Sequence, residues 1–374
     1  MPSLLPNTLP DTRRTVLPYQ TRGRGSAVNM SGRFEALNRC LVDDGWQGLE
    51  DLPAFRTEVF EEAAKTIITR NDSPDLSFDR SINPYRGCEH GCAYCYARPA
   101  HSYMGLSPGL DFESKLFAKP NGAELLRAEL LRAELAAPGY VPRTIALGAN
   151  TDAYQPVERQ RRITRQILEV LAEFNHPVGI VTKSALVTRD IDILAPMAEK
   201  GLVKVAVSVT TLDPRLARSM EPRASTPPKR LDAIARLAAA GIPVTVMAAP
   251  IIPAVNDSEI EAILKAAQAT GAREAGYVML RLPHEVKEVF RSWLASAMPD
   301  RASRVMSQVR AASGGKDYDA SFGRRQTGTG PYAWMVGRRF ELACQRLGLN
   351  GARLKLSTEH FRRPPQPGEQ LTLL

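Results

Sequence analysis

The chain has 374 residues, of which 44% are hydrophobic and 24% are charged, and its formal net charge is +9. These values are those of an ordinary globular protein and exclude a disordered or fibrous chain. With five cysteines and no apolar signal-peptide core in its proline-bearing amino terminus, the chain does not fit a disulfide-rich secreted fold. We expect a cytoplasmic protein that does not associate with a membrane.

Two segments precede the regular part of the sequence. Residues 1–30 are rich in Pro, Arg, Thr and Gly and lack hydrophobic periodicity, which predicts a disordered basic tail. Residues 31–79 form an irregular lead-in, with one helix predicted near Pro53–Lys65. Neither segment shows the alternating pattern that begins at about residue 80.

Between residues 80 and 299, short strand-like runs alternate with helical runs. A first strand is expected just before Cys88, and five more are expected at Thr144–Gly148, Val178–Thr182, Lys204–Val209, Val244–Ala248 and Gly276–Leu280. The expected helices are Gln160–Phe174, Asp190–Glu199, Lys229–Ala240, Asp257–Thr270 and Glu285–Ala297. Apolar strands that alternate with helices predict a parallel sheet covered on its outer face. We predict an α/β fold of this kind, with its functional residues at the carboxyl ends of the strands.

Residues 300–374 are predicted to form a basic helical C-terminal extension. Helices are expected at Arg301–Ala311 and Tyr332–Leu347, on either side of a glycine-rich loop at Gly323–Pro331. The extension carries thirteen Lys and Arg against six Asp and Glu, which gives +7, whereas five Arg and one Asp give residues 1–34 a charge of +4. Basic ends favour a nucleic-acid partner, and we expect Arg324 and Arg325 to grip phosphate. A purely solvating role of these charges is the alternative.

Three of the five cysteines lie within eight residues, in the segment NPYRGCEHGCAYCYARP that spans Asn83–Pro99. Four thiolates would ligate every iron of a [4Fe–4S] cluster, whereas Cys88, Cys92 and Cys95 leave one iron open to bind and activate a ligand. Two alternatives are a buried stripe on one helix face and a structural zinc site that uses His90 as a fourth ligand. Cys344 lies in an apolar helical pattern and is expected to be a core residue.

The cysteine spacing, with an aromatic Tyr94 before the third cysteine, resembles the cluster signature of the radical S-adenosylmethionine (SAM) superfamily. Over roughly residues 80–300 the chain resembles the spore-photoproduct-lyase-like branch, whose members are also called DNA repair photolyases. The resemblance implies an open (β/α)6 partial TIM barrel, which is the radical SAM core. It also implies a [4Fe–4S] cluster that reductively cleaves SAM to a 5′-deoxyadenosyl radical.

The resemblance implies roles for the three cysteines and for a motif after the second strand. Cys88, Cys92 and Cys95 would be the cluster ligands, and Tyr94 would pack beside the cluster and the adenine. The motif GANTDAYQPVE places Asn150, Thr151 and Asp152 where the family holds the SAM amino group. A strand-to-helix turn with capping residues is the alternative reading of this motif.

Residues at the next strand ends complete the implied SAM site. Lys183 and Ser208 stand at positions that resemble a SAM-contacting Lys and Ser of the same branch, and their alternatives are a surface lysine and a core serine. Glu221 and Arg223, in the motif MEPR, would lie near the SAM carboxylate or ribose. A structural ion pair between these two residues is the alternative.

The chain departs from the branch at one position. Spore photoproduct lyases of endospore formers carry a hydrogen-donating cysteine just after the second strand, where this chain has Asn150. The resemblance leaves Tyr94 and Tyr96 as candidate hydrogen-transfer residues, so a lyase reaction would have to follow a different route.

We therefore expect a radical SAM enzyme that acts on an unidentified substrate, with nucleic acid as the leading candidate. Radical modification of a peptide or protein is a second hypothesis. A non-enzymatic nucleic-acid-binding protein with a structural metal site is a third. The expected partner for catalysis is a reducing electron donor of the flavodoxin or ferredoxin type, and the protein is expected to be a monomer.

Overall fold

The computed structural model of the protein describes residues 21–35, 55–136 and 140–364. Its main feature is a seven-stranded sheet in the order β10-β9-β8-β7-β6-β3-β2. The strands are β2 (Ile68–Arg70), β3 (Arg80–Ile82), β6 (Ile145–Leu147), β7 (Val178–Thr182), β8 (Val203–Ser208), β9 (Val244–Ile251) and β10 (Glu274–Met279). The six strands from β3 to β10 are parallel and follow chain order, while β2 is antiparallel to β3. This arrangement confirms the predicted six-strand partial barrel.

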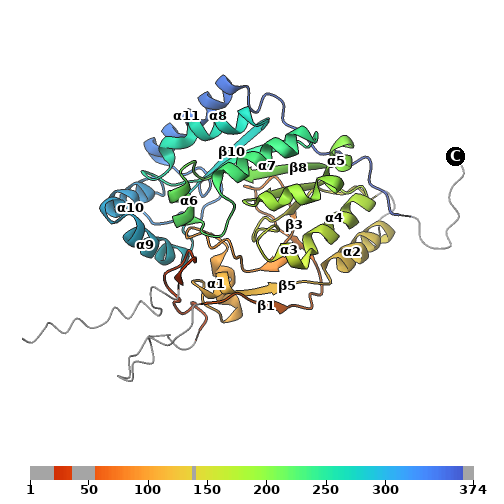
Figure 1. The fold of residues 1–374 in the computed structure, drawn as a ribbon, viewed down its shortest axis with the longest axis horizontal. Helices are drawn as coiled ribbons and strands as arrows, with labels where there is room; N and C mark the ends of the chain where they lie inside the picture. Colours follow the sequence, from red (N-terminus) through yellow and green to blue (C-terminus); the bar gives the residue numbers. More distant parts are fainter. Residues whose placement is uncertain (1–20, 36–54, 137–139, 365–374) are drawn as a thin grey trace, which may run out of the picture.

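Helices cover the outer face of the sheet (Figure 1). The longer helices of residues 111–297 are α2 (Gly122–Ala136), α4 (Ile163–Glu173), α5 (Ile191–Glu199), α7 (Pro227–Ala239), α8 (Ile260–Ala269) and α9 (Val286–Ala297), and the shorter helices are α1 (Asp111–Ser114), α3 (Glu158–Arg161) and α6 (Pro214–Met220). Valines on alternate positions of β8 are fully buried, as a covered parallel sheet requires. No helix in the described ranges is both long and apolar enough to cross a membrane.

The predicted strands and helices of residues 140–299 all occur, with one division. The helix expected at Gln160–Phe174 is split into α3 and α4, because Arg162 between them adopts a left-handed conformation with φ of 51°. The sequence prediction missed α2 and the strand β5 (Lys115–Ala118). Both missed elements lie in the long connection between the cysteine segment and β6.

The helix predicted near Pro53–Lys65 is wrong where the structure describes the chain. Residues Glu58–Glu61 form strand β1, which pairs in parallel with β5 and has Phe60 stacked on Phe117 at 5.4 Å. Together with β4 (Tyr85–Arg86), these strands form a small three-stranded sheet beside α1 (Figure 1). A partner strand distant in the sequence decides the conformation here, and local pattern cannot show such a partner.

The disordered tail predicted for residues 1–30 is wrong for residues 21–30, whereas residues 1–20 lie outside the described part. Val28 and Ser26 are buried, and the backbone N–H groups of Gly25 and Ser26 donate to the Glu113 carboxylate at 2.9 and 2.8 Å. A Cβ on Gly25 would lie 1.5 Å from the carbonyl oxygen of Gly91, so this segment packs directly on the cysteine loop. The polar groups of residues 21–30 therefore form specific buried contacts.

The predicted helices of the C-terminal extension are α10 (Ala302–Ala311) and α11 (Gly330–Leu347). Helix α11 packs on α8, and Arg339 pairs with Glu261 at 2.6 Å. Beyond α11, the side chain of Asn350 bonds both backbone groups of Ala275 and so caps the free edge of β10. Cys344 is buried in this packing, which confirms its predicted place in the core. Part of the positive charge of the extension is thus neutralised by acids of the barrel.

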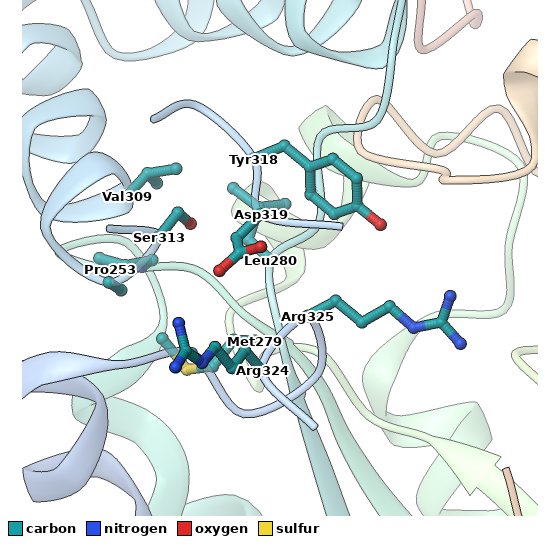
Figure 2. A pocket seen from close by; sticks show the side chains of 11 residues that line it. Pro253, Met279, Leu280, Val309, Ser313, Tyr318, Asp319, Arg324 and Arg325 are labelled. Atoms are coloured by element: carbon teal, nitrogen blue, oxygen red, sulfur yellow. The ribbon is translucent and has the colours of Figure 1, made fainter. Parts of the chain in front are cut away.

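The glycine-rich loop joins the two ends of the open barrel. The carbonyl oxygen of Gln326 accepts from the N–H of Met279 on edge strand β10 at 2.7 Å. At the other end, Arg325 pairs with Asp75, in the connection between β2 and β3, at 2.6 Å. Figure 2 shows Arg324 and Arg325 leaving the loop in different directions. Arg324 and Arg325 were both expected to bind phosphate. The expectation is not met for Arg325, because its guanidinium already pairs with Asp75.

Candidate functional site

The three clustered cysteines lie on a loop that follows β4 at the carboxyl edge of the parallel sheet. Gly87 and Gly91 adopt positive φ angles of 76° and 67°, which allow the tight turns that place Cys88 and Cys92. Because Cys88–Cys95 contains no helix, the cysteines are not a stripe on a helix face. We call residues 87–97 the cysteine loop.

Buried polar side chains from neighbouring segments hold the cysteine loop. The guanidinium of Arg98 donates to the Cys92 carbonyl at 3.0 and 2.8 Å and pairs with Glu113. The amide of Gln155 donates to the Gly87 carbonyl at 3.1 Å and accepts from the N–H of Glu89 at 2.9 Å. The sequence prediction missed Arg98 and Gln155, although both stand inside motifs that it had singled out. Their bonds connect the loop to Glu113 in α1 and to the segment after β6.

Burial raises the pKa of each thiol in the cysteine loop above its ordinary value. The nearby Lys183 ammonium opposes this shift at Cys92 and Cys95. Thiols in such surroundings become thiolates when a metal centre supplies positive charge, and metal binding then releases protons. The donor set therefore fits a metal centre bound through sulfur.

The arrangement of these donors within the described residues does not suit a single zinc ion. Among the described residues, no three His, Cys, Asp or Glu side chains converge as the ligands of one ion must. A [4Fe–4S] cluster attaches each thiolate to a different iron, so its ligands do not converge on one atom. His90, the proposed fourth zinc ligand, is instead buried with its Nδ1 at 3.4 Å from Asp152, and burial lowers its pKa to about 4.

The polar residues of the motif after β6 mainly form hydrogen bonds to other parts of the protein. The Asp152 carboxylate accepts from the Thr182 hydroxyl and from the Lys183 N–H, both at 2.7 Å. The hydroxyl of Thr151 is buried and donates to the Tyr85 carbonyl at 2.6 Å. Asn150 is exposed, with its N–H bonded to the Asn83 side chain at 2.9 Å. Of the three residues expected to hold SAM, only Asn150 has an uncommitted side chain.

Lys183 and Ser208 lie at the carboxyl ends of β7 and β8. The Lys183 Nζ is 5.9 Å from the centre of the Tyr94 ring, and it forms no ion pair within the described part of the chain. The side chain of Ser208 is buried, and its hydroxyl bonds no described residue, while its carbonyl accepts from Arg230 at 3.0 Å. The structure therefore has a lysine near Tyr94 and a serine hydroxyl at the ends of neighbouring strands, and neither side chain has a polar partner among the described residues.

Tyr94 belongs to a buried polar network. Its hydroxyl donates to the Glu221 carboxylate, which also accepts from Thr210 at 2.7 Å and pairs with the buried Arg230. Burial raises the pKa of Glu221, and the Arg230 guanidinium opposes that shift. The alternative of an ion pair between Glu221 and Arg223 does not hold, because Arg223 pairs with Glu89 at 3.2 Å. Both carboxylate oxygens of Glu221 are therefore engaged within the protein, and one of them accepts from Tyr94.

Tyr96, the residue after Cys95, faces the space beyond the strand ends. It is 43% exposed, and its hydroxyl donates to the Ala149 carbonyl after β6. Arg281 follows β10, and its guanidinium carbon lies over the Tyr96 ring, 5.0 Å from the ring centre. Sequence reasoning missed Arg281, because nothing in the pattern RLPHEV distinguishes it from a surface arginine.

The fold and the site define the class of this protein: a partial barrel of six parallel strands with a three-thiol loop at its ligand-binding edge. The chain belongs to the Radical SAM superfamily, whose sequence model matches residues 82–267. An uncharacterized protein of Mycobacterium bovis is 36% identical over 288 residues, which are 74% of this chain and 83% of the relative. An uncharacterized protein of Methanocaldococcus jannaschii is 28% identical over 204 residues, which are 54% of this chain and 71% of the relative.

Solved structures of spore photoproduct lyase share this fold. A complex of that enzyme with dinucleoside spore photoproduct has a TM-score of 0.57 at 15% identity, covering 78% of this chain and 80% of the enzyme. A variant with bound AdoMet and the same dinucleoside has the same TM-score, identity and coverage. The likeness confirms the partial-barrel fold, and family membership makes the chain a radical SAM enzyme.

Proposed function

We propose that Cys88, Cys92 and Cys95 hold a [4Fe–4S] cluster, that the enzyme reductively cleaves SAM, and that its substrate is a nucleic acid. One observation carries the cofactor assignment: a three-thiol loop held by buried hydrogen bonds lies beside Lys183, which has no acidic partner among the described residues, at the carboxyl edge of the barrel. When both are bound, the reduced cluster and SAM supply a 5′-deoxyadenosyl radical that abstracts hydrogen from the substrate.

Different residues around the cysteine loop would contact different parts of SAM. Lys183 would pair with the SAM carboxylate, because a cation without an acidic partner at a strand end suits that group. Ser208 and Asn150 would donate or accept hydrogen bonds at the amino-acid end of SAM. Asp152 would act indirectly, by fixing the backbone of Lys183. Tyr94 would shape the adenine side of the site, since its hydroxyl is already engaged by Glu221.

The nucleic-acid substrate is supported by two observations. The fold matches that of an enzyme whose structures include a bound dinucleoside photoproduct, and the chain carries a net charge of +9. With Asn150 in place of a cysteine, hydrogen return to a product radical would need another donor. Tyr96 fits this role better than Tyr94, because 43% of its surface is exposed. A flavodoxin or ferredoxin is the proposed reductant.

The proposed function is tested with anaerobically reconstituted protein. Dithionite-reduced enzyme should release 5′-deoxyadenosine and methionine from SAM. With deuterated DNA or RNA as substrate, deuterium should appear in the 5′-deoxyadenosine. Failure of SAM cleavage in protein with a full cluster would contradict the radical chemistry. Deuterium transfer from peptides only would instead establish modification of a peptide or protein.

A further inference from the structure

Arg281 is a half-buried cation with incomplete partners. Its Nε is buried and has no hydrogen-bond partner, and its Nη2 reaches only the Tyr318 hydroxyl at 3.4 Å. No carboxylate of the described residues lies within ion-pair distance of it. The Arg281 charge contributes to the lowered pKa of Asp75, but the oxygens of Asp75 already accept from Arg325 and from the Gly323 N–H.

Other buried arginines of this protein are fully paired. Arg98 pairs with Glu113 at 2.5 Å, and Arg230 pairs with Glu221 while donating to two carbonyl groups. A buried guanidinium without an acid or a full set of acceptors is unfavourable, and proteins usually compensate it. Arg281 thus has donors available for an acceptor from outside the chain.

The position of Arg281 connects it with the reaction site. It follows β10 by two residues, its guanidinium lies over Tyr96 at 5.0 Å, and Tyr96 is bonded in sequence to the cluster ligand Cys95. The guanidinium also donates to the Tyr318 hydroxyl at 3.4 Å, so two tyrosines contact it. A planar guanidinium is suited to a phosphate or carboxylate held through two parallel hydrogen bonds.

Two cations without an acidic partner among the described residues therefore lie at carboxyl ends of the barrel strands. Lys183, at the end of β7, lies near Cys92 and Cys95 and is assigned to SAM, whereas Arg281 lies at the end of the far edge strand β10. Arg281 has donors left for a second oxyanion, and the substrate is the remaining molecule that enters this site.

We propose that Arg281 binds an oxyanion of the substrate, which is a backbone phosphate if the substrate is a nucleic acid. This assignment rests on the proposed function for the identity of the substrate. The inference that the bound group is an oxyanion depends only on the contacts of Arg281. Arg281 is a specificity residue for the charged part of the substrate, and the hydrogen is abstracted elsewhere on that molecule.

The test uses the full chain, reconstituted with its cluster, and a fluorescein-labelled single-stranded oligonucleotide. Binding is compared between an ordinary phosphodiester backbone and an uncharged methylphosphonate backbone. Arg281→Gln removes the charge and the fork of donors, and Arg281→Lys keeps the charge only. Arg236→Gln is the matched control, because Arg236 is exposed near the end of α7, a few residues before the amino end of β9.

Arg281→Gln should weaken phosphodiester binding about tenfold and reduce the salt slope by about one. Arg281→Lys should lose less affinity than Arg281→Gln, and Arg236→Gln should match the wild type. Methylphosphonate binding should not respond to Arg281→Gln. An equal loss with both backbones, or no loss, would overturn the proposal. A loss of SAM affinity in place of oligonucleotide affinity would assign the anion to SAM and would also overturn it.

A second measurement separates this proposal from the proposed function. Inorganic phosphate should show a broadened phosphorus resonance with the wild type and a sharp one with Arg281→Gln. If no oligonucleotide binds but this contrast persists, the nucleic-acid assignment fails while the oxyanion site stands. If neither oligonucleotide nor phosphate distinguishes the two proteins, the oxyanion site is wrong, whatever the outcome of SAM cleavage.

Discussion

Arg230 and Glu221 form an ion pair that is almost wholly removed from solvent, directly behind the cysteine loop. The same Glu221 carboxylate accepts the hydroxyl of Tyr94, so one charge pair connects the start of α7, the end of α6 and the residue between two proposed cluster ligands. A pair in this position stabilises a particular arrangement of the loop, because either charge left alone would be strongly unfavourable.

Glu221→Gln should therefore lower the free energy of unfolding by about 3 to 5 kcal/mol, since it leaves Arg230 buried without a counter-ion. Urea unfolding followed by circular dichroism measures this change. The double variant Glu221→Met, Arg230→Met should be more stable than Glu221→Gln, because it removes both charges together. If the single variant unfolds at the same urea concentration as the wild type, the pair does not have this role.

Cys92→Ala should lose nearly all of the about four iron atoms per chain that reconstitution introduces, because a two-thiolate site cannot hold the cluster. Iron analysis and the broad visible absorption of the cluster give the measurement. Cys344→Ala is the matched control, since Cys344 is buried against α8 and β10 in the main core. Equal iron loss in both variants, or stoichiometric zinc in the wild type, would reject the cluster assignment.

Lys183→Gln should weaken SAM binding about tenfold while iron content stays near that of the wild type, because it removes a charge-assisted contact to the carboxylate. Asp152→Ala should behave differently. It releases the Thr182 hydroxyl and the Lys183 N–H, so both SAM affinity and iron retention should fall. Calorimetric SAM titration together with iron analysis separates the two patterns. Normal SAM affinity in Lys183→Gln would show that another group binds the carboxylate.

Asp75→Asn should loosen the glycine-rich loop, because the Arg325 ion pair and the Gly323 N–H bond both end on this carboxylate. Trypsin should then cleave after Arg324 or Arg325 faster than in the wild type, as followed by mass spectrometry. Asp79→Asn is the control, since Asp79 pairs with Arg143 near the same strands and does not contact the loop. Equal cleavage rates in the two variants would show that Asp75 does not hold the loop.

Stability should also depend on pH through His176, whose pKa burial lowers from an ordinary 6.5 to about 4. The unfolded chain binds this proton more tightly than the folded one. The free energy of unfolding should therefore fall by about 3 kcal/mol from His176 alone as the pH falls from about 6.5 to about 4. His176→Gln should reduce this slope in urea titrations at successive pH values. An unchanged slope would mean that His176 is not buried in its neutral form.

The strands were predictable where local pattern and tertiary partner agree. Val178–Thr182 forms β7 with the predicted bounds, because its short apolar run suits a strand of a covered parallel sheet. Glu58–Glu61 was misjudged because its pairing partner Lys115–Ala118 lies more than fifty residues away in the sequence. The buried contacts of Gly25 and Ser26 with Glu113 were invisible for the same reason.

The sequence by itself determined the alternation of strands and helices and the three-cysteine signature, because both are written in spacings of a few residues. The tertiary structure alone decided the partners of the charged groups. It paired Glu221 with Arg230 and not with Arg223, joined Arg325 to Asp75 across 250 residues, and gave Arg281 no acidic partner within the described ranges. Such pairings depend on where distant segments meet in space, and charge energies depend on burial at that place, so no local pattern encodes them.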